Sequence, residues 1–365
     1  MPLLQSIQSR IRWESEPSLC PCIQHGGGGV IELRRGTFQD GAARGVEAIL
    51  LDTGAVRLLV LPTRGMGIWR MEADGHAFGW QSPVAGPIHP NLVPTFDPSG
   101  LGWLEGFDEL LVRCGLESNG APQHDPRGQL QYPLHGRIAN LPAIDLSAEF
   151  EPSTGRLVLE GTVLESRLFF KRFQLRSRLT VHVNSAVVEI EDTIINAAAQ
   201  PATAQMLYHI NLGVPLLSDG ARIRVAGQQV RGKDERSNDE IDRWDQIGPP
   251  ETGYAERVYF IDPRADPSGN AACLLQAVDR AVGFGVTFDT QTLPHCVVWK
   301  NTAAMEDGYV VGIEPATNLP NTRDEEAAAG RIVSLDPGGE ITFRLALHPL
   351  VSSAQVSDFA DTFAL

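Results

Sequence analysis

Apolar and polar residues alternate with a period of two along most of this chain, and this pattern limits its fold more than any other feature. Between residues 172 and 183, apolar side chains such as Phe173 and Leu179 share one parity, while arginines and other polar side chains share the other. Successive side chains of a β-strand point to opposite faces, so this run predicts a strand with one buried face. A turn at Asn184-Ser185 and a second alternating run at 187–196 predict an antiparallel hairpin.

Comparable runs recur through the rest of the sequence. They cover residues 157–163, 206–214, 258–262, 272–277, 281–288, 295–300 and 309–314. Turn residues at Asp52-Thr53-Gly54 and Asp336-Pro337-Gly338-Gly339 predict two more hairpins, and the 36 glycines and 25 prolines suit a chain with many turns. No amphipathic helix of ten residues or more is expected. The sequence therefore predicts an all-β fold, built as one large antiparallel β-sandwich.

Two segments lack the strand pattern. Residues 75–142 are rich in Gly, Pro, His and Trp, and residues 227–253 are polar and charged. Loops of this length in a compact protein are usually functional or disordered, and the aromatic and polar content of the first favours an ordered, site-forming loop. Because no composition break or repeat divides the chain, we expect a single domain over residues 1–365, with residues 1–30 as an N-terminal extension.

The chain carries 30 Lys and Arg against 45 Asp and Glu, a formal net charge of −15. This charge repels nucleic-acid phosphates and anionic membranes, so neither is an expected partner. The five cysteines are scattered and odd in number, which indicates reduced thiols rather than a disulfide framework. No stretch reaches eighteen apolar residues, and Arg10 and Arg12 interrupt the start of the chain before a signal-peptide core could form. We therefore expect a soluble, cytoplasmic protein, either a monomer or a homodimer.

Two conspicuous local motifs predict little. The run from Gly26 to Gly29 lacks the Lys-Ser/Thr ending of a phosphate-binding loop and is not followed by a helix pattern. Cys20-Pro21-Cys22 lacks the two-residue spacing of zinc and redox pairs, and no second pair completes a tetrahedral site. Neither a bound phosphate nor a metal held by cysteines is expected.

Three other segments contain residue types that transfer protons. His135 stands in a Leu-His-Gly segment within the first long loop, and Glu314 ends an apolar run directly before a proline. On the expected strand 206–214, His209 and Asn211 share one face while apolar residues occupy the other. A polar pair on such a strand needs solvent, a hydrogen-bond partner or a ligand. Taken one at a time, each segment is explained as well by a structural histidine or an ordinary strand end.

Together, and in this order, the three segments resemble the aldose 1-epimerase family, the galactose mutarotases and their relatives. In that family one histidine lies in a Leu-His-Gly segment, a second precedes an Asn-Leu pair on a strand, and a glutamate lies in a late Glu-Pro segment. His135, His209 and Glu314 match these positions, and the resemblance extends over residues 30–350. Residues 102–115 resemble a less characterised epimerase-like branch, and Arg137 replaces the family's second glycine after Leu-His-Gly.

The resemblance implies a galactose mutarotase-like supersandwich and an isomerase that interconverts sugar anomers through the open-chain aldehyde. It implies Glu314 as the general base for the C1 hydroxyl, His209 as the general acid for the ring oxygen, and His135 as hydrogen-bonding support for the ring oxygen or a neighbouring hydroxyl. We expect the acid and the base on opposite sides of the breaking bond. Because ring opening needs only an acid and a base, no metal or organic cofactor is expected, and the expected partner is a small-molecule sugar.

Further residues are predicted to bind the substrate. Asn211 shares the strand face of His209, Asn119 lies in the long loop, and Asp245 is the candidate for the family's hydroxyl-binding aspartate. Arginines near the motif segments predict a carboxylate, phosphate or sulfonate on the sugar, since guanidinium groups bind these in a bidentate manner. These arginines are Arg64, Arg113, Arg137 and Arg323. Loop aromatics either stack on the sugar ring or belong to the core; they are Trp69, Trp80, Trp103 and Phe107.

Two functions of other classes remain open at the level of sequence. A non-catalytic carbohydrate-binding protein would keep the sandwich and its aromatic side chains but would not require a glutamate with two histidines. A metal-dependent sugar isomerase would use His135, His209, His295 and Glu314 as ligands. Against it, the sequence has no close His-x-His or His-Glu spacing that would supply two ligands from one element.

Overall fold

The computed structural model describes residues 9–15, 19, 23–24 and 30–365. The glycine run at 26–29 and the Cys20-Pro21-Cys22 motif lie outside the described residues. About 46% of the chain is strand and 13% is helix, well below the one-third helix that soluble proteins average. The expected all-β fold is therefore confirmed.

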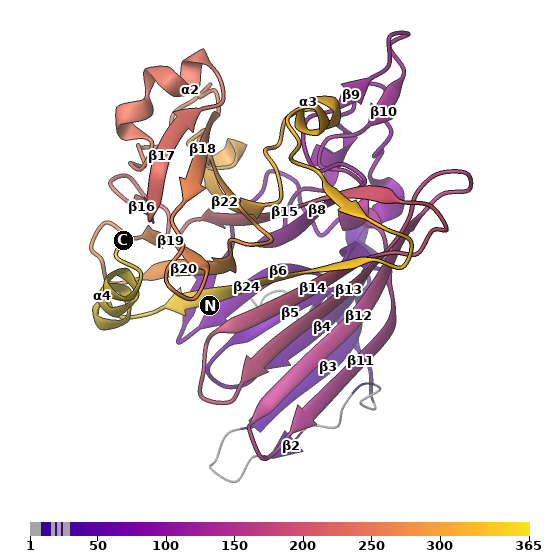
Figure 1. The fold of residues 1–365 in the computed structure, drawn as a ribbon. Helices are drawn as coiled ribbons and strands as arrows, with labels where there is room; N and C mark the ends of the chain where they lie inside the picture. Colours follow the sequence, from indigo (N-terminus) through magenta and orange to yellow (C-terminus); the bar gives the residue numbers. More distant parts are fainter. Residues whose placement is uncertain (1–8, 16–18, 20–22, 25–29) are drawn as a thin grey trace.

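Two antiparallel sheets pack face to face (Figure 1). The larger sheet has the strand order β1-β3-β4-β5-β6-β8-β15-β22-β21-β18-β17, and the smaller has the order β11-β12-β13-β14-β24-β20-β19-β16. The strands of the larger sheet are β1 (Ile11–Trp13), β3 (Val30–Phe38), β4 (Glu47–Asp52), β5 (Arg57–Leu61), β6 (Gly67–Ala73), β8 (Leu111–Leu116), β15 (Ala202–Gly213), β22 (Val310–Ala316), β21 (His295–Asn301), β18 (Arg257–Pro263) and β17 (Gly227–Gly232), with β2 (Ile23–Gln24), β7 (His76–Phe78) and β23 (Val333–Leu335) attached beside them.

The smaller sheet forms the second layer. Its strands are β11 (Ala143–Glu151), β12 (Arg156–Ser166), β13 (Arg172–His182), β14 (Val188–Asn196), β24 (Glu340–Leu350), β20 (Gly283–Asp289), β19 (Asn270–Gln276) and β16 (Arg222–Val225). The α-helices are α2 (Glu235–Asp239), α3 (Arg323–Ala328) and α4 (Ser353–Thr362), and β9 (Gln123–His124) pairs separately with β10 (Leu130–Tyr132).

The core lies between the two sheets, and the alternation read from the sequence decides which side chains reach it. In β13, Phe173, Leu175 and Leu179 are buried while the arginines between them face outward. Across the interface, the ring of Tyr208 on β15 meets that of Phe343 on β24 at 6.5 Å. Burial of one apolar face from each sheet is what holds the layers together.

Hairpins were predicted at three turns, and two of them are confirmed. β13 pairs with β14 around Asn184, and β4 pairs with β5 around Thr53. The turn at 336–339 does not close a hairpin, because β23 before it pairs with β15 in the larger sheet and β24 after it pairs with β14 in the smaller one. That turn is a crossing between the two layers.

Two elements depart from the expectations. β8 lies inside the segment read as a long loop, and all six of its residues are buried. A strand buried on both faces has no period-two pattern to reveal it. Helix α4 is ten residues long, although no helix of that length was expected; the side chain of Ser352 caps its first turn by accepting a hydrogen bond from the amide of Gln355, and Val356, Phe359 and Ala360 form its buried face.

The two long segments stand on opposite sides of the central strands β8, β15 and β22 (Figure 1). One carries β9 and β10 and lies near α3, and the other carries β17 and α2. The central strands between them carry the candidate site. Among the described residues, no helix is both long enough and apolar enough to span a lipid bilayer.

Candidate active site

The site begins with the register of three neighbouring strands. β15 pairs with β22 so that Leu207 faces Ala316 and Ile210 faces Ile313, which places His209 beside Glu314. On the far side of β22, Val297 of β21 pairs with Glu314. Because side chains alternate along each strand, His209, Asn211 and Glu314 all project from the face opposite the sandwich core.

The three residues predicted to be catalytic come together. Nε2 of His209 lies 3.2 Å from Oε1 of Glu314, and the ring centres of His209 and His135 are 5.4 Å apart with the rings nearly perpendicular. His209 and Glu314 are almost completely covered, with exposed fractions of 4% and 2%. The acid and the base were expected on opposite sides of the sugar bond. Instead, His209 and Glu314 lie side by side on adjacent strands and contact each other directly.

A glycine makes room for this contact. Gly312 stands opposite Asn211 on β15 and Trp299 on β21. A Cβ atom at this position would lie 2.7 Å from Oε1 of Glu314 and 2.9 Å from Cε1 of His209. Any larger residue would push the pair apart, so Gly312 belongs to the site although no sequence motif singled it out.

Aromatic side chains cover the pair. Phe107 meets the His209 ring at 4.9 Å and Trp299 meets it at 5.4 Å, while Trp103 lies 4.6 Å from the His135 ring. Trp103 and Phe107 belong to the long segment read as site-forming, but Trp299 lies on β21 and was missed. Trp299 is two residues from Val297 on the expected strand 295–300, so the two side chains lie on the same face. This alternation is the sequence pattern that could have indicated Trp299.

The other two flagged tryptophans do not reach the pair. Trp80 packs behind Phe107 at 5.0 Å. Trp69 lies in a separate apolar cluster, where its ring meets Phe38. Its indole N–H donates to the carboxylate of Asp108, so both tryptophans are structural.

The tautomer of His135 follows from its hydrogen bond. Nδ1 lies 2.9 Å from the backbone carbonyl of Asn119, which can only accept, so Nδ1 carries the proton. Burial lowers the pKa of His135 to about 4, so the ring is neutral and Nε2 is an acceptor. Asn119 itself is fully buried and exchanges two side-chain hydrogen bonds with Asn318. Asn119 therefore holds His135 through its backbone, and its amide is not available for the predicted substrate contact.

Burial shifts both members of the pair toward their neutral forms. Desolvation, supported by the nearby carboxylate of Glu256, raises the pKa of Glu314 to about 8. Desolvation, supported by the neighbouring His135, holds the pKa of His209 well below its usual value. Near neutral pH the titrating proton of the pair therefore lies mainly on Glu314 and His209 is neutral. The two side chains are 3.2 Å apart, so their titrations are coupled and a minor form carries the proton on His209.

Polar atoms without hydrogen-bond partners gather around the pair. Among the described residues they include Nε1 of Trp103, Nδ1 of His209 and Oδ1 of Asn211, all buried. Oε1 of Glu314 belongs with them, because its 3.2 Å contact with His209 does not have the geometry of a hydrogen bond. The amide nitrogen of Asn211 is already used, because it donates to the carbonyls of Glu109 and His209. Buried polar groups normally find partners, so this cluster is arranged for a ligand or water that offers several donors and acceptors.

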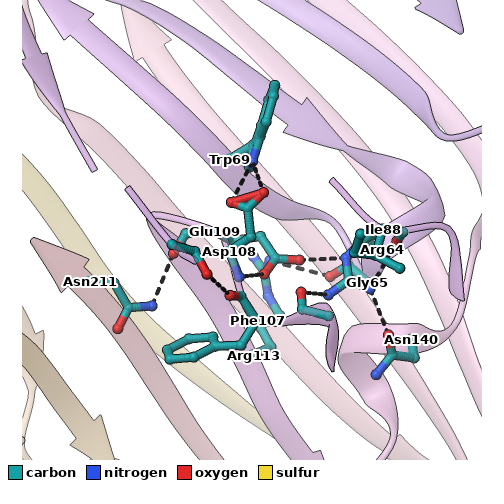
Figure 2. Close-up of polar contacts among 12 residues, drawn as sticks. Arg64, Gly65, Trp69, Ile88, Phe107, Asp108, Glu109, Arg113, Asn140 and Asn211 are labelled. Carbon is teal, nitrogen blue, oxygen red and sulfur yellow. Dashed lines mark hydrogen bonds and ion pairs between the residues drawn. The ribbon is translucent and has the colours of Figure 1, made fainter. Parts of the chain in front are cut away.

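The predicted anion-binding role of Arg64 is corrected by its surroundings (Figure 2). Its guanidinium is 2% exposed and donates to Glu109 at 2.6 Å, to Asn140 at 2.7 Å and to the carbonyl of Gly106 at 2.7 Å. These bonds fasten the long segment to the larger sheet. Glu109 in turn accepts from Asn211 through its backbone carbonyl, so Arg64 supports the site from behind.

Arg113 is likewise inside the protein. Its guanidinium binds Asp192 through two nitrogens, at 2.5 and 3.1 Å, and also donates to Ser177. Asp192 and Ser177 belong to the smaller sheet, so Arg113 joins the two layers of the sandwich. It has no free donor directed at the pair, and its predicted substrate contact is corrected.

The remaining predicted contacts also lie away from the pair. Arg323 is buried and donates to Thr203 at the start of β15, and Arg137 lies over the ring of Phe96. Asp245 forms an ion pair with Arg222 at 2.7 Å in an exposed position. Sequence reasoning failed here because an arginine or aspartate near a motif along the chain can face a partner from a distant strand. Asn211 is the one predicted substrate-binding residue that lies beside the pair.

Among the described residues, no group of three or more His, Cys, Asp or Glu side chains is placed to hold a metal ion. His295 is a ligand in the metal-dependent alternative. Burial lowers its pKa, and the charged groups that act on it most are Arg331 and Asp262, which are not part of the His209–Glu314 pair. The arrangement at the pair is suited to moving protons: a carboxyl and an imidazole in contact, a second neutral imidazole as acceptor, and unpartnered polar atoms under an aromatic cover.

Comparisons with other proteins concern the family and the fold of the chain. Residues 43–348 match a family described as a domain of unknown function (DUF4432). A candidate aldose 1-epimerase from Klebsiella pneumoniae subsp. pneumoniae is 30% identical, with a TM-score of 0.89 over 92% of this chain and 88% of that one.

More distant structures share the fold alone. A galactose mutarotase-like protein from Clostridium acetobutylicum is 13% identical, with a TM-score of 0.58 over 84% of this chain and 95% of that one. A candidate aldose 1-epimerase from Escherichia coli K12 is also 13% identical, with a TM-score of 0.53 over 81% and 96%. No curated protein is similar enough to count as a match.

Proposed function

The chain belongs to the DUF4432 family and, with it, to the aldose 1-epimerase and galactose mutarotase-like proteins, and from this premise we propose that it interconverts the anomers of an aldose by acid/base ring opening. The reactive form is the one with the shared proton on His209: ionised Glu314 takes the proton of the C1 hydroxyl and protonated His209 delivers its proton to the ring oxygen. The bond between C1 and the ring oxygen breaks, and the C1 carbonyl forms. Rotation about the C1–C2 bond followed by the reverse steps closes the ring as the other anomer.

A side-by-side acid and base suits this reaction. The hydroxyl oxygen and the ring oxygen are both bonded to C1, so two neighbouring catalytic groups can reach both of them from one side. Ring opening leaves the proton on Glu314 and His209 deprotonated, which is the state that ring closure needs: His209 takes the proton of the ring-closing hydroxyl and Glu314 returns its proton to the C1 oxygen. Positioned acid and base groups each contribute roughly 10² to 10⁴ in rate.

The cluster of unpartnered buried polar atoms carries this proposal. An aldose presents hydroxyl groups that both donate and accept, and the site offers a donor on Trp103 and acceptors on Asn211 and Glu314. His135 accepts a hydrogen bond at Nε2, so it serves a sugar hydroxyl rather than the ring oxygen, which has no proton to give. Because the pair is almost covered, binding requires Trp103 and Phe107 to shift outward.

The proposal makes no demand for an acidic sugar. Arg64 and Arg113, which prompted that expectation, are neutralised by Glu109 and Asp192 in the interior. Glu256 lies close enough to influence Glu314, and it disfavours a second negative charge at the site. Asn211 and the aromatic cover are the proposed substrate contacts.

Exchange spectroscopy by NMR tests the proposal. Protein is added to equilibrium mixtures of neutral hexoses, pentoses and hexuronic acids, and magnetisation transfer between the α and β C1 protons is measured against the uncatalysed rate. The proposal expects accelerated exchange for at least one sugar. A sugar that binds, by its line broadening or by calorimetry, while no sugar in the panel exchanges faster would instead indicate the carbohydrate-binding alternative.

A further inference from the structure

The turn of the β12–β13 hairpin is the most exposed apolar feature of the described residues. Leu168, Phe169 and Phe170 follow one another there with exposed fractions of 78%, 94% and 57%. Single exposed apolar residues are common on soluble proteins, but a contiguous apolar projection marks an interaction site. This hairpin tip, residues 168–170, takes no part in the candidate active site.

The backbone of the tip is also unusual. Phe169 has a φ of 69°, in the left-handed region that favours glycine. A bulky residue there costs roughly 1 to 2 kcal/mol relative to the ordinary helical region. The tip therefore holds an aromatic ring in solvent at a position where glycine would be less strained, which is a cost that burial of the ring against a partner would offset.

Cations surround the tip. The Arg167 guanidinium lies 3.2 Å from the centre of the Phe170 ring, and Lys171 and Arg172 follow directly. Arg172 is exposed and forms no ion pair with any other described residue. The whole chain has a formal charge of −15, so a positively charged tip is complementary to the acidic remainder of another copy.

A receiving surface exists on the outer face of the same sheet. A cavity of about 590 Å³ lies there, walled on one side by Phe363 just after α4. Its floor includes a row of mostly small side chains across four strands, namely Thr180, Glu189, Ala346 and Thr287. The arginines around it are paired with glutamates, namely Arg156 with Glu151, Arg178 with Glu160 and Arg344 with Glu191. Glu189 and Asp266 remain as acidic groups at the cavity.

The positions of tip and cavity allow a closed pair. The tip lies directly before β13, and the cavity includes Arg178 and Thr180 near the other end of that strand. Ten residues from Phe170 to Thr180 separate them by roughly 30 Å along the strand. A two-fold axis between these points would bring the tip of each copy over the cavity of the other. The two contacts are then identical, and no tip or cavity is left free to bind a third copy.

We propose that the protein forms a two-fold homodimer in which the hairpin tip of each copy docks in the cavity on the outer face of the smaller sheet of its partner. The aromatic rings of the tip fill a hollow that none of the described side chains of its own chain fills, and Arg167 and Arg172 face Glu189 and Asp266. Each tip carries two exposed phenylalanine rings, and a ring can bury about 150 to 250 Å². The four rings of the two contacts therefore bury about 600 to 1,000 Å² before the surface of the cavity is counted, which fits a small interface.

Sedimentation velocity and light scattering of the full chain test the proposal. Wild type is expected at twice the chain mass of 39.6 kDa at micromolar concentration. Phe169→Ser removes an exposed ring, and Ala346→Trp fills the receiving cavity without touching the tip; both are expected to give monomers with unchanged circular dichroism. Val278→Ser removes another exposed apolar side chain, 60% exposed, at a different turn and is expected to remain dimeric.

Three results would overturn the proposal. One is a monomeric wild type across the concentration range, and another is a dimer that survives either Phe169→Ser or Ala346→Trp. The third is a monomer that binds phosphatidylserine vesicles and loses that binding with Phe169→Ser, since this would assign the tip to a lipid surface. None of these measurements depends on catalytic activity, so the dimer and the proposed reaction stand or fall separately.

Discussion

At the scale of single residues, Glu314 links activity with stability. Its pKa rises from 4.5 in the unfolded chain to about 8 in the folded protein. The folded state holds the proton more tightly, so this carboxyl favours folding fully below about pH 4.5, and that contribution is lost as pH rises to about 8. Replacement with an uncharged residue of the same shape removes the cost of burying the ionised carboxylate.

We therefore expect Glu314→Gln to have a higher Tm than wild type at pH 8, and a Tm close to that of wild type at pH 5. Thermal unfolding followed by circular dichroism at both pH values measures this. A lower Tm for the variant at pH 8 would show that the ionised carboxylate is stabilised by its surroundings, contrary to the burial argument.

The pH profile should report the single proton shared by His209 and Glu314. Below the lowered pKa of His209 the pair gains a second proton and loses its base, and above about pH 8 it loses its last proton and with it the acid. We expect kcat/KM for anomer exchange to be bell-shaped, with an alkaline limb near pH 8 and an acid limb well below pH 6.5. An activity that rises through pH 8 and then stays high would mean that Glu314 acts alone as a base.

Gly312 sets the spacing of the pair. Because a Cβ atom there would lie 2.7 Å from Oε1 of Glu314, Gly312→Ala should displace the carboxylate. Displacements of this size in a catalytic group cost about 10² in rate, so we expect a loss of that order in kcat. Gly248→Ala is the matched control, since a Cβ at Gly248 meets nothing within 4 Å. Equal activity of the two variants would remove Gly312 from the site.

At the scale of elements, the long segment 75–142 depends on Arg64. Its guanidinium donates to Glu109, two residues before β8, and to the side chain of Asn140 (Figure 2). It also donates to the carbonyl of Gly106, the residue before Phe107 of the aromatic cover. Arg64→Leu would leave Glu109 buried without its partner, a loss that costs about 3 to 5 kcal/mol. We expect a clearly lower midpoint in urea unfolding. An unchanged midpoint with a raised KM for acidic sugars only would restore Arg64 as a substrate-binding residue.

The elements that sequence predicted well are those with one buried face. β13 and β14 alternate because one side of the smaller sheet faces solvent. β8 was not predicted because both of its faces are buried, so its sequence does not alternate. α4 was not predicted because only three of its residues are buried, so its apolar face is narrow. The order of pairing was beyond reach for another reason: β8 and β15 are neighbours although about ninety residues separate them along the chain, and no local pattern records such a contact.

At the scale of the whole molecule, the sandwich presents its catalytic candidates on the outer face of the larger sheet. The motif order along the chain indicated His135, His209 and Glu314. The strand register places His209 beside Glu314, and the long segment brings the His135 ring to within 5.4 Å of the His209 ring. The arginines were misread because their meaning depends on carboxylates that only the folded chain brings near, such as Asp192 from the opposite layer. Trp299 and Gly312 completed the site from strands whose pairing the sequence alone did not reveal.

The most direct test of the account is the rate of anomer exchange, measured by NMR on the best sugar of the panel, for wild type, Glu314→Gln, His209→Asn and the double variant. Each single variant is expected to lose about 10² or more in kcat while remaining folded. The double variant is expected to lose less than the product of the two, because the residues act as a unit. Full activity in folded Glu314→Gln would contradict the central claim that His209 and Glu314 move the protons of ring opening.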